Sequence, residues 1–401
     1  MTMNSSPLQS LQSGNWFKLI CGASYQHLPA VRNLTFAYTL AGADCIDIAA
    51  DPAVIAVARE AMVTASNWAE PARVRGFPAV SQPLLMVSFN DGEDPHFRKA
   101  EFDSTACPSD CWRPCETVCP ANAITFNDPV NPSIGGVRDP LCYGCGRCIP
   151  ICPSQIISTR SYVSTPENIA PLVLSAGVDA IEIHTQVGRD SDFKRLWYSV
   201  QPWINQLKLV AISCPDGGDL INYLRTLYEI ISPLPCPLIW QTDGRPMSGD
   251  IGAGTTTASL KLGQKVLAAN LPGYVQLAGG TNHSTVAKLK SMGLLASSRP
   301  QNPSKLARPG VARVNSLRSR TVAGVAYGSY ARVLLSPLLE KLESNYTPEP
   351  GSSPNNDVGL ATTAQPSALT RLETNPELLW QTVSLAHSLV AQLKGFQSAR
   401  G

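Results

Sequence analysis

Residues 142–153 read CYGCGRCIPICP, and the cysteine spacing of this stretch decides how the surrounding chain folds. Four cysteines are separated by two, two and three residues, and a proline follows the last one. Thiolates spaced this closely can converge on one metal centre when the backbone winds tightly around it. The stretch therefore predicts a small metal-binding unit, and the sequence next has to indicate which metal it holds.

The spacing is that of bacterial two-cluster ferredoxins, in which the last cysteine of each run ligates the other cluster. Zinc is the alternative, but zinc sites normally use two CxxC pairs, and a third cysteine followed by Cys-Pro is not their pattern. We therefore interpret residues 142–153 as one half of a ferredoxin-like module for two [4Fe-4S] clusters.

A second run, CPSDCWRPCETVC at residues 107–119, precedes the first. Both runs end in Cys-Pro followed by similar residues, as after an internal duplication. All gaps in residues 107–119 are three residues long, and Trp112 and Pro114 lie in the widened gaps. A wider loop changes the backbone N–H bonds to sulfur and the solvent access, both of which set the reduction potential of a cluster. We therefore expect the two clusters to have unequal potentials. One cluster with four spare thiols is the alternative.

The resemblance to two-cluster ferredoxins implies that each run gives three ligands to its own cluster and one to the other. The first cluster would then be held by Cys107, Cys111, Cys115 and Cys152, and the second by Cys142, Cys145, Cys148 and Cys119. The four remaining cysteines lie singly in or beside apolar runs and are interpreted as buried, inert thiols: Cys21, Cys45, Cys214 and Cys236.

Around the cysteine-rich segment, short β-rich runs alternate with helical patterns, which is typical of a parallel α/β fold. One helix after each of eight strands favours a (β/α)8 TIM-like barrel, and an open doubly wound sheet is the alternative. Strands are expected to begin at Phe17, Cys45, Leu84, Asp179, Leu207, Pro237, Tyr274 and Val322. Helices are expected over 29–42, 52–66, 166–176, 191–206, 218–231, 257–270, 283–292 and 329–343.

The cysteine-rich segment follows the third strand, so it is expected to emerge at the carboxyl ends of the strands, where barrels carry their functional sites.

Residues 344–368 are rich in Pro, Ser, Asn and Gly, and further on Asn375 and Pro376 begin an apolar helical pattern. This predicts a linker followed by a tethered amphipathic helix. The expected parts are barrel residues 1–95, the insert 96–160, barrel residues 161–343, a disordered linker 344–368 and the C-terminal helix within 369–401.

Composition narrows the class of partner. With 44% apolar residues and a net charge of +2, the chain has no bulk attraction to nucleic acid or to an anionic membrane. It shows neither a signal peptide nor an apolar run of membrane-spanning length, so we expect a cytoplasmic protein, in which thiols stay reduced and bind metals.

Residues 296–320 carry six Lys or Arg and no acid, which indicates a solvated loop or, alternatively, a docking site for an anion.

Two features point into the expected barrel. In the fourth strand, Glu182 and His184 alternate with isoleucines and share the inner face, where they form either an internal hydrogen-bonded pair or a site for a ligand or a proton. Turns after the seventh and eighth strands open helices, the place where barrels commonly bind a phosphate. The residues of this expected anion site are Gly279, Gly280, Thr281, Asn282, Gly328 and Ser329.

These turns resemble those of flavin-binding barrels of the dihydroorotate and dihydropyrimidine dehydrogenase type, in which a ferredoxin module passes electrons to FMN. Those families carry a strand-end lysine in a PVxVK-like context, whereas residues 237–241 here read PLIWQ. FMN is therefore a candidate that the sequence does not favour.

Four motifs resemble the LdpA family of cyanobacterial light-dependent period proteins: CPSDCWRPCETVCPANAI at 107–124, DGRPMSGDIGAGTT at 243–256, QLAGGTN at 276–282 and VAYGSYAR at 325–332. The resemblance implies an iron-sulfur redox sensor, rather than a known metabolic enzyme, that reports redox state or light to the circadian clock through clock or signalling proteins. Two alternatives stay open: a ferredoxin-linked flavin oxidoreductase, and a simple electron carrier that exchanges with a ferredoxin-type donor.

Overall fold

The structure is a computed structural model, and it describes most of the barrel, part of the insert and the C-terminal helix. The described residues are 6–22, 28–78, 81–92, 98–119, 123–126, 136–138, 142, 148–161, 166–245, 252, 254–295, 321–344 and 371–395. The basic stretch 296–320 and the linker 344–368, apart from its first residue, lie outside them.

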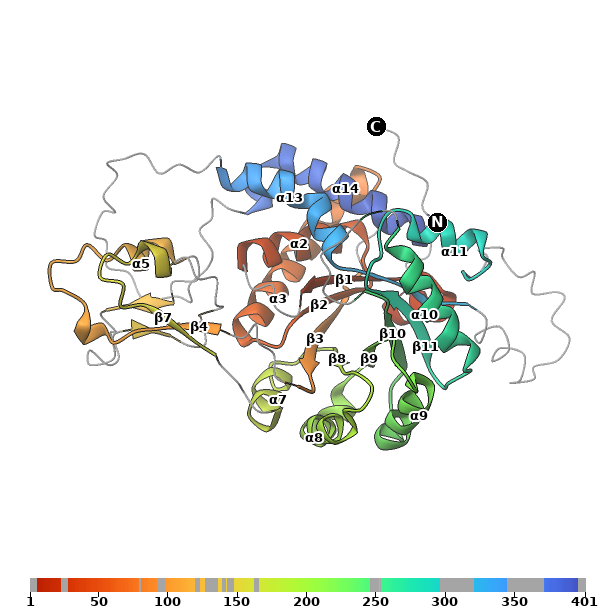
Figure 1. Ribbon diagram of the computed structural model, residues 1–401. Helices are drawn as coiled ribbons and strands as arrows, with labels where there is room; N and C mark the ends of the chain where they lie inside the picture. Colours follow the sequence, from red (N-terminus) through yellow and green to blue (C-terminus); the bar gives the residue numbers. More distant parts are fainter. Residues whose placement is uncertain are drawn as a thin grey trace, which may run out of the picture.

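Eight parallel strands close into a barrel, in the ring order β1-β12-β11-β10-β9-β8-β3-β2 (Figure 1). The predicted barrel is confirmed, and the alternative of an open sheet is wrong, because β1 pairs with both β12 and β2. The strands are β1 (Trp16–Gly22), β2 (Cys45–Ala49), β3 (Leu84–Asn90), β8 (Ala180–His184), β9 (Leu209–Pro215), β10 (Leu238–Asp243), β11 (Tyr274–Ala278) and β12 (Gly324–Tyr327).

Helices surround the barrel and follow the predicted order. The expected helix 191–206 ends early: α8 (Asp190–Val200) gives way to the 3-10 turn η2 (Gln201–Gln206), where Pro202 has no backbone N–H to continue the α-helix. The others are α2 (Leu28–Ala41), α3 (Pro52–Asn67), α4 (Ala69–Val74), α7 (Pro166–Leu174), α9 (Leu220–Ile231), α10 (Thr256–Ala268), α11 (Thr285–Ser291) and α13 (Ser329–Ser344).

The amino-terminal end of the barrel is closed by an apolar layer. A short helix, α1 (Pro7–Ser13), begins with a capping box between Ser6 and Gln9 and places the buried Leu11 against the barrel end. Leu11 belongs to one cluster with Trp16 and other inward side chains of the strands. This end is therefore packed in the ordinary way, and polar interior side chains lie toward the other end.

The cysteine-rich insert lies between β3 and α7 and projects from one side of the barrel (Figure 1). Its described part has two small antiparallel pairs, β4 with β7 and β5 with β6. The elements are β4 (Arg98–Glu101), η1 (Ser104–Ala106), α5 (Pro114–Val118), β5 (Ile124–Thr125), β6 (Gly136–Val137), α6 (Cys148–Ile151) and β7 (Ser158–Ser161).

The C-terminal helix α14 (Pro376–Lys394) docks on the barrel itself. The side chain of its N-cap, Asn375, accepts a hydrogen bond from Leu378 N at 3.1 Å, and Gly395 ends the helix in a left-handed conformation. The buried face of α14 packs against α2 and α13 (Figure 1). Since α3 and β1 also contact α2, every residue of α2 is buried. The predicted C-terminal amphipathic helix therefore packs on the barrel helices.

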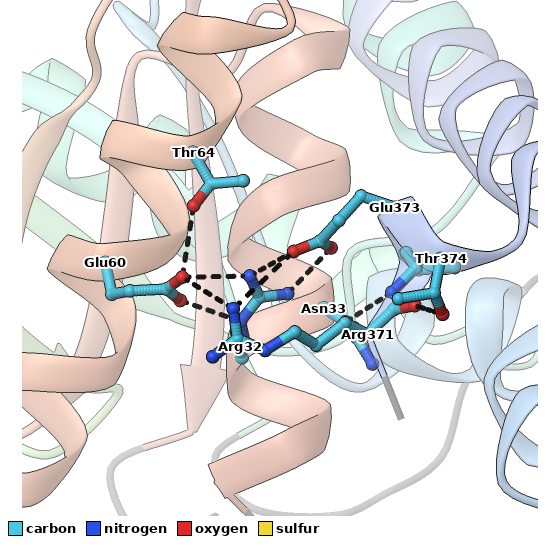
Figure 2. A network of polar contacts seen from close by, with 8 residues as sticks. Arg32, Asn33, Glu60, Thr64, Arg371, Glu373 and Thr374 are labelled. Carbon is cyan, nitrogen blue, oxygen red and sulfur yellow. Dashed lines mark hydrogen bonds and ion pairs between the residues drawn. The ribbon is translucent and has the colours of Figure 1, made fainter. Parts of the chain in front are cut away.

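A buried guanidinium fixes the start of this C-terminal unit (Figure 2). Arg32 of α2 is 1% exposed, and it donates to Glu60 of α3 at 2.7 Å and to Glu373 of η5 (Leu372–Thr374) at 2.9 Å. Arg371 also donates to Glu60, at 3.3 Å. The C-terminal unit is therefore tied to α2 and α3 by charge as well as by apolar packing.

No helix among the described residues has both the length and the apolar character needed to cross a bilayer.

Candidate metal centre and barrel interior

The cysteines of both runs lie on short elements of the insert. Cys107 follows η1, Cys115 lies in α5, whose first residue is Pro114, and Cys148 begins α6. Proline at the first helical position is pre-set for the turn that α5 makes. Also described are Cys111, Cys119, Cys142 and Cys152, whereas Cys145 lies outside the described residues.

Three cysteines of the first run interact with the last cysteine of the second run or with one another. Burial raises the pKa of Cys107, and a hydrogen bond with Cys111 and the nearby Cys152 raise it further. Burial likewise raises the pKa of Cys115, to which Cys152 and Cys107 contribute. The fold thus brings Cys152 to the first run, although it lies far along the sequence.

The cysteine thiols would have to lose their protons to ligate a metal. Within the described part of the chain, no three Cys, His, Asp or Glu side chains lie close enough to hold one metal ion. Thiols whose pKa is raised need a metal to become thiolates at neutral pH, which is the usual linkage between metal binding and deprotonation.

Backbone N–H groups already point at two of the sulfurs. Ala100 N donates to Cys142 Sγ at 3.4 Å, and Ala123 N donates to Cys119 Sγ at 3.2 Å. Such bonds tune the potential of iron-sulfur clusters. Both acceptors belong to the set that the sequence assigned to the second cluster.

The widened loop of the first run has an unusual backbone. Arg113 adopts φ 55° directly before Pro114, a left-handed conformation that is uncommon for a residue with a side chain. Its guanidinium lies over the Phe126 ring at 4.4 Å, and the neighbouring Trp112 is 72% exposed. The sequence singled out Trp112 and Pro114, and the structure adds Arg113 as the residue that turns the loop.

A buried lysine lies inside the barrel, and sequence analysis missed it. Lys18 of β1 is fully buried, its Nζ is 2.9 Å from Asp47 of β2, and it donates to Glu182 of β8. Burial lowers the pKa of Lys18, but the two carboxylates outweigh it and raise the pKa above its usual value. The alternation in β1 could have revealed Lys18, because Phe17 and Leu19 occupy the outer face.

Neutral side chains extend this network across the barrel. Gln241 donates to Glu182 at 2.6 Å, Gln276 donates to Gln241 at 2.5 Å, and Trp16 donates to Gln276 at 2.5 Å. The whole chain of contacts is buried. Barrel interiors are usually filled by branched apolar side chains, so this polar layer is a departure that costs desolvation free energy.

The structure brings Glu182 and His184 together at the carboxyl end of this network. His184 Nε2 lies 3.2 Å from Glu182 Oε1, and the His184 side chain is 28% exposed, so it lies between the interior and the solvent. Asp243, at the end of β10, was not proposed from the sequence. Burial raises its pKa to about 6, although His184 and Lys18 counteract this.

Asp243→Asn should change how stability depends on pH. Because the carboxyl pKa is raised on folding, the contribution of Asp243 to stability is fully present below its unfolded pKa and is lost as pH rises through about 6. The variant should therefore gain stability relative to the parent between pH 4.5 and pH 7, as measured by urea unfolding. Asp216→Asn, at an exposed carboxylate, is the control; parallel curves for parent and Asp243→Asn would contradict the assignment.

The turns expected to bind an anion use their side-chain donors within the protein. Thr281 donates to Ala326 O at 2.6 Å, and Asn282 donates to Gly252 O at 2.7 Å. Gly279 and Gly280 have positive φ, and a Cβ on Gly279 would collide with the Asp243 carboxylate. Gly328 and Ser329 open α13, where Arg332 donates to Ser329 Oγ at 3.3 Å. The anion site stays a prediction, and the Asp243 carboxylate counts against it.

The chain combines a parallel α/β barrel with a cysteine-rich insert after the third strand, and the insert matches an iron-sulfur domain. Residues 107–163 match the family model of the LdpA Fe-S cluster-binding domain, and residues 172–392 match that of the Light dependent period A C-terminal domain. Light dependent period A of Synechococcus elongatus is 46% identical over 390 residues, which cover 97% of this chain and 94% of that protein. The chain belongs to the LdpA family, as the four motifs indicated.

Among solved structures, fructose-bisphosphate aldolase from Campylobacter jejuni aligns with 97% of this chain and 93% of its own, at 9% identity and a TM-score of 0.30. A likeness this weak bears on neither fold nor function. The barrel rests on the strand pairing described above.

Proposed function

We propose that the protein holds two [4Fe-4S] clusters on the crossed ligand sets. Cys107, Cys111, Cys115 and Cys152 would hold the first, and Cys142, Cys145, Cys148 and Cys119 the second. The observation that carries the proposal is the two cysteine runs on the short elements of an insert that matches an Fe-S cluster-binding domain. The crossed sets are supported by the contribution of Cys152 to the raised pKa of Cys107 and Cys115, because crossing is a property of two-cluster modules. When bound, such clusters supply one-electron transfer.

We further propose that the protein senses cellular redox state and takes part in setting a circadian period. Support comes from the family, whose Synechococcus member is named for a light-dependent period, and from the cysteine module. Clock or signalling proteins in the cytoplasm are the proposed partners, with a ferredoxin-type protein as electron donor. A sensor requires that the partner interacts differently with the two oxidation states.

The two-cluster proposal predicts about eight iron and eight sulfide per chain after anaerobic purification. Electron paramagnetic resonance during a redox titration should resolve two signals with different midpoint potentials, because the two runs surround their sulfurs differently. About four iron atoms per chain, with a single signal, would show that one run is not a ligand set.

State-dependent binding separates the sensor from its two alternatives. The full-length protein is immobilised in its oxidised or dithionite-reduced form, and candidate clock proteins are tested against both. A partner that binds one form only supports the sensor, whereas rapid exchange with a ferredoxin and no state-dependent partner supports the carrier. Flavin absorption that persists after the clusters are bleached would instead support the flavin oxidoreductase.

A further inference from the structure

One buried ion pair joins the insert to the barrel. Lys99, in β4 of the insert, places Nζ 3.7 Å from Asp51 Oδ2, and the two side chains are only 9% and 3% exposed. Asp51 lies directly before α3, and its Oδ1 caps that helix by accepting from Ala53 N at 2.8 Å and Val54 N at 3.4 Å. The lysine therefore reaches the carboxylate that starts a barrel helix.

The same strand also contacts a proposed cluster ligand. Ala100, the residue after Lys99, donates its backbone N–H to Cys142 Sγ at 3.4 Å. Ala100 is 5% exposed and pairs with Thr159 of β7, so the strand position is fixed by the β4–β7 ladder. Two consecutive residues thus bind the barrel carboxylate and the sulfur.

We propose that Lys99 couples the charge of the cluster site at Cys142 to the barrel through Asp51. This inference rests on the proposed function, because it requires a cluster at Cys142 that accepts an electron from a one-electron donor. The Lys99 side chain reaches the Asp51 carboxylate, while the backbone N–H of the next residue in β4 points at Cys142 Sγ, so one short stretch of strand connects the two negative centres. Added negative charge at the sulfur side attracts the ammonium and weakens its long pair with Asp51.

The middle of α3 is where this coupling can be observed. Glu60 of α3 accepts hydrogen bonds from Arg32 and Arg371, which fix the start of the C-terminal unit (Figure 2). One helix therefore connects the Asp51 cap with the contacts of residues 371–375. A weaker ion pair between Lys99 and Asp51 is expected to alter amide hydrogen exchange in the first turn of α3. Exchange at residues 371–375 shows whether the change extends to the C-terminal unit.

The test compares the intact, cluster-loaded protein with Lys99→Met and Lys99→Arg. Midpoint potentials come from electron paramagnetic resonance, and amide hydrogen exchange is measured in oxidised and reduced samples. In Lys99→Met, the signal that depends on Cys142 should shift to a more negative potential, because a nearby positive charge is lost, while the other signal stays. The exchange difference at residues 52–57 should disappear. Lys99→Arg should restore both, and Lys208→Met, at an exposed pair with Asp179, should change neither.

Two outcomes overturn different claims. If the parent protein carries no cluster that depends on Cys142, the proposed ligand sets are wrong. If the parent shows both signals and a redox-dependent exchange difference that persists unchanged in Lys99→Met, the clusters stand and the coupling role of Lys99 is wrong. Iron content measured on each variant excludes cluster loss as the cause of a missing difference.

Discussion

Lys18→Met is expected to destabilise the protein by about 3–5 kcal/mol, because it leaves Asp47 and Glu182 buried without their cation. Both carboxylates are at most 1% exposed, so water cannot replace the ammonium without opening the barrel. Urea unfolding should show a lower midpoint with an unchanged slope, since the surface exposed on unfolding stays the same.

Lys208→Met is the matched control, because it removes a lysine from an exposed ion pair with Asp179 and should cost at most about 1 kcal/mol. Lys18→Met combined with Glu182→Gln should recover part of the loss, since one uncompensated charge is removed. A Lys18→Met protein as stable as the parent would show that the polar layer is not held together by its charges.

Cys152→Ala is expected to abolish the same cluster signal as Cys115→Ala, although the two cysteines belong to different runs. Each variant should retain about four iron atoms per chain, and Cys148→Ala should lose the other signal instead. The physical reason is the approach of Cys152 to the first run, where it contributes to the raised pKa of Cys107 and Cys115.

Cys236→Ala provides the control for this series, because that half-buried cysteine lies outside the insert, just before β10. Its iron content should match that of the parent. If Cys152→Ala and Cys148→Ala lost the same signal, each run would ligate its own cluster, and the crossed assignment would have to be abandoned.

Regular elements of this chain were predictable because their signals are local. Strand β8 alternates isoleucines with Glu182 and His184, and α14 follows an asparagine cap and a first-turn proline. One prediction failed locally: the helix expected to reach residue 206 ends at Val200, where tertiary packing and Pro202 favour a 3-10 turn. The count of eight strands came from such patterns, but closure of the sheet required the pairing of β1 with β12.

The features of the candidate sites are also of two kinds, those that the sequence determines and those that only the tertiary structure reveals. By itself, the sequence determined the cysteine spacing, the kind of cofactor and the order of strands and helices, because these depend on residues near one another along the chain. Only the tertiary structure decided which charges meet. Lys18 and Glu182 are 164 residues apart and become neighbours when the barrel closes, and Lys99 meets Asp51 when the insert folds back on α3. Buried ion pairs of this kind depend on the geometry of the whole fold, which no local spacing encodes.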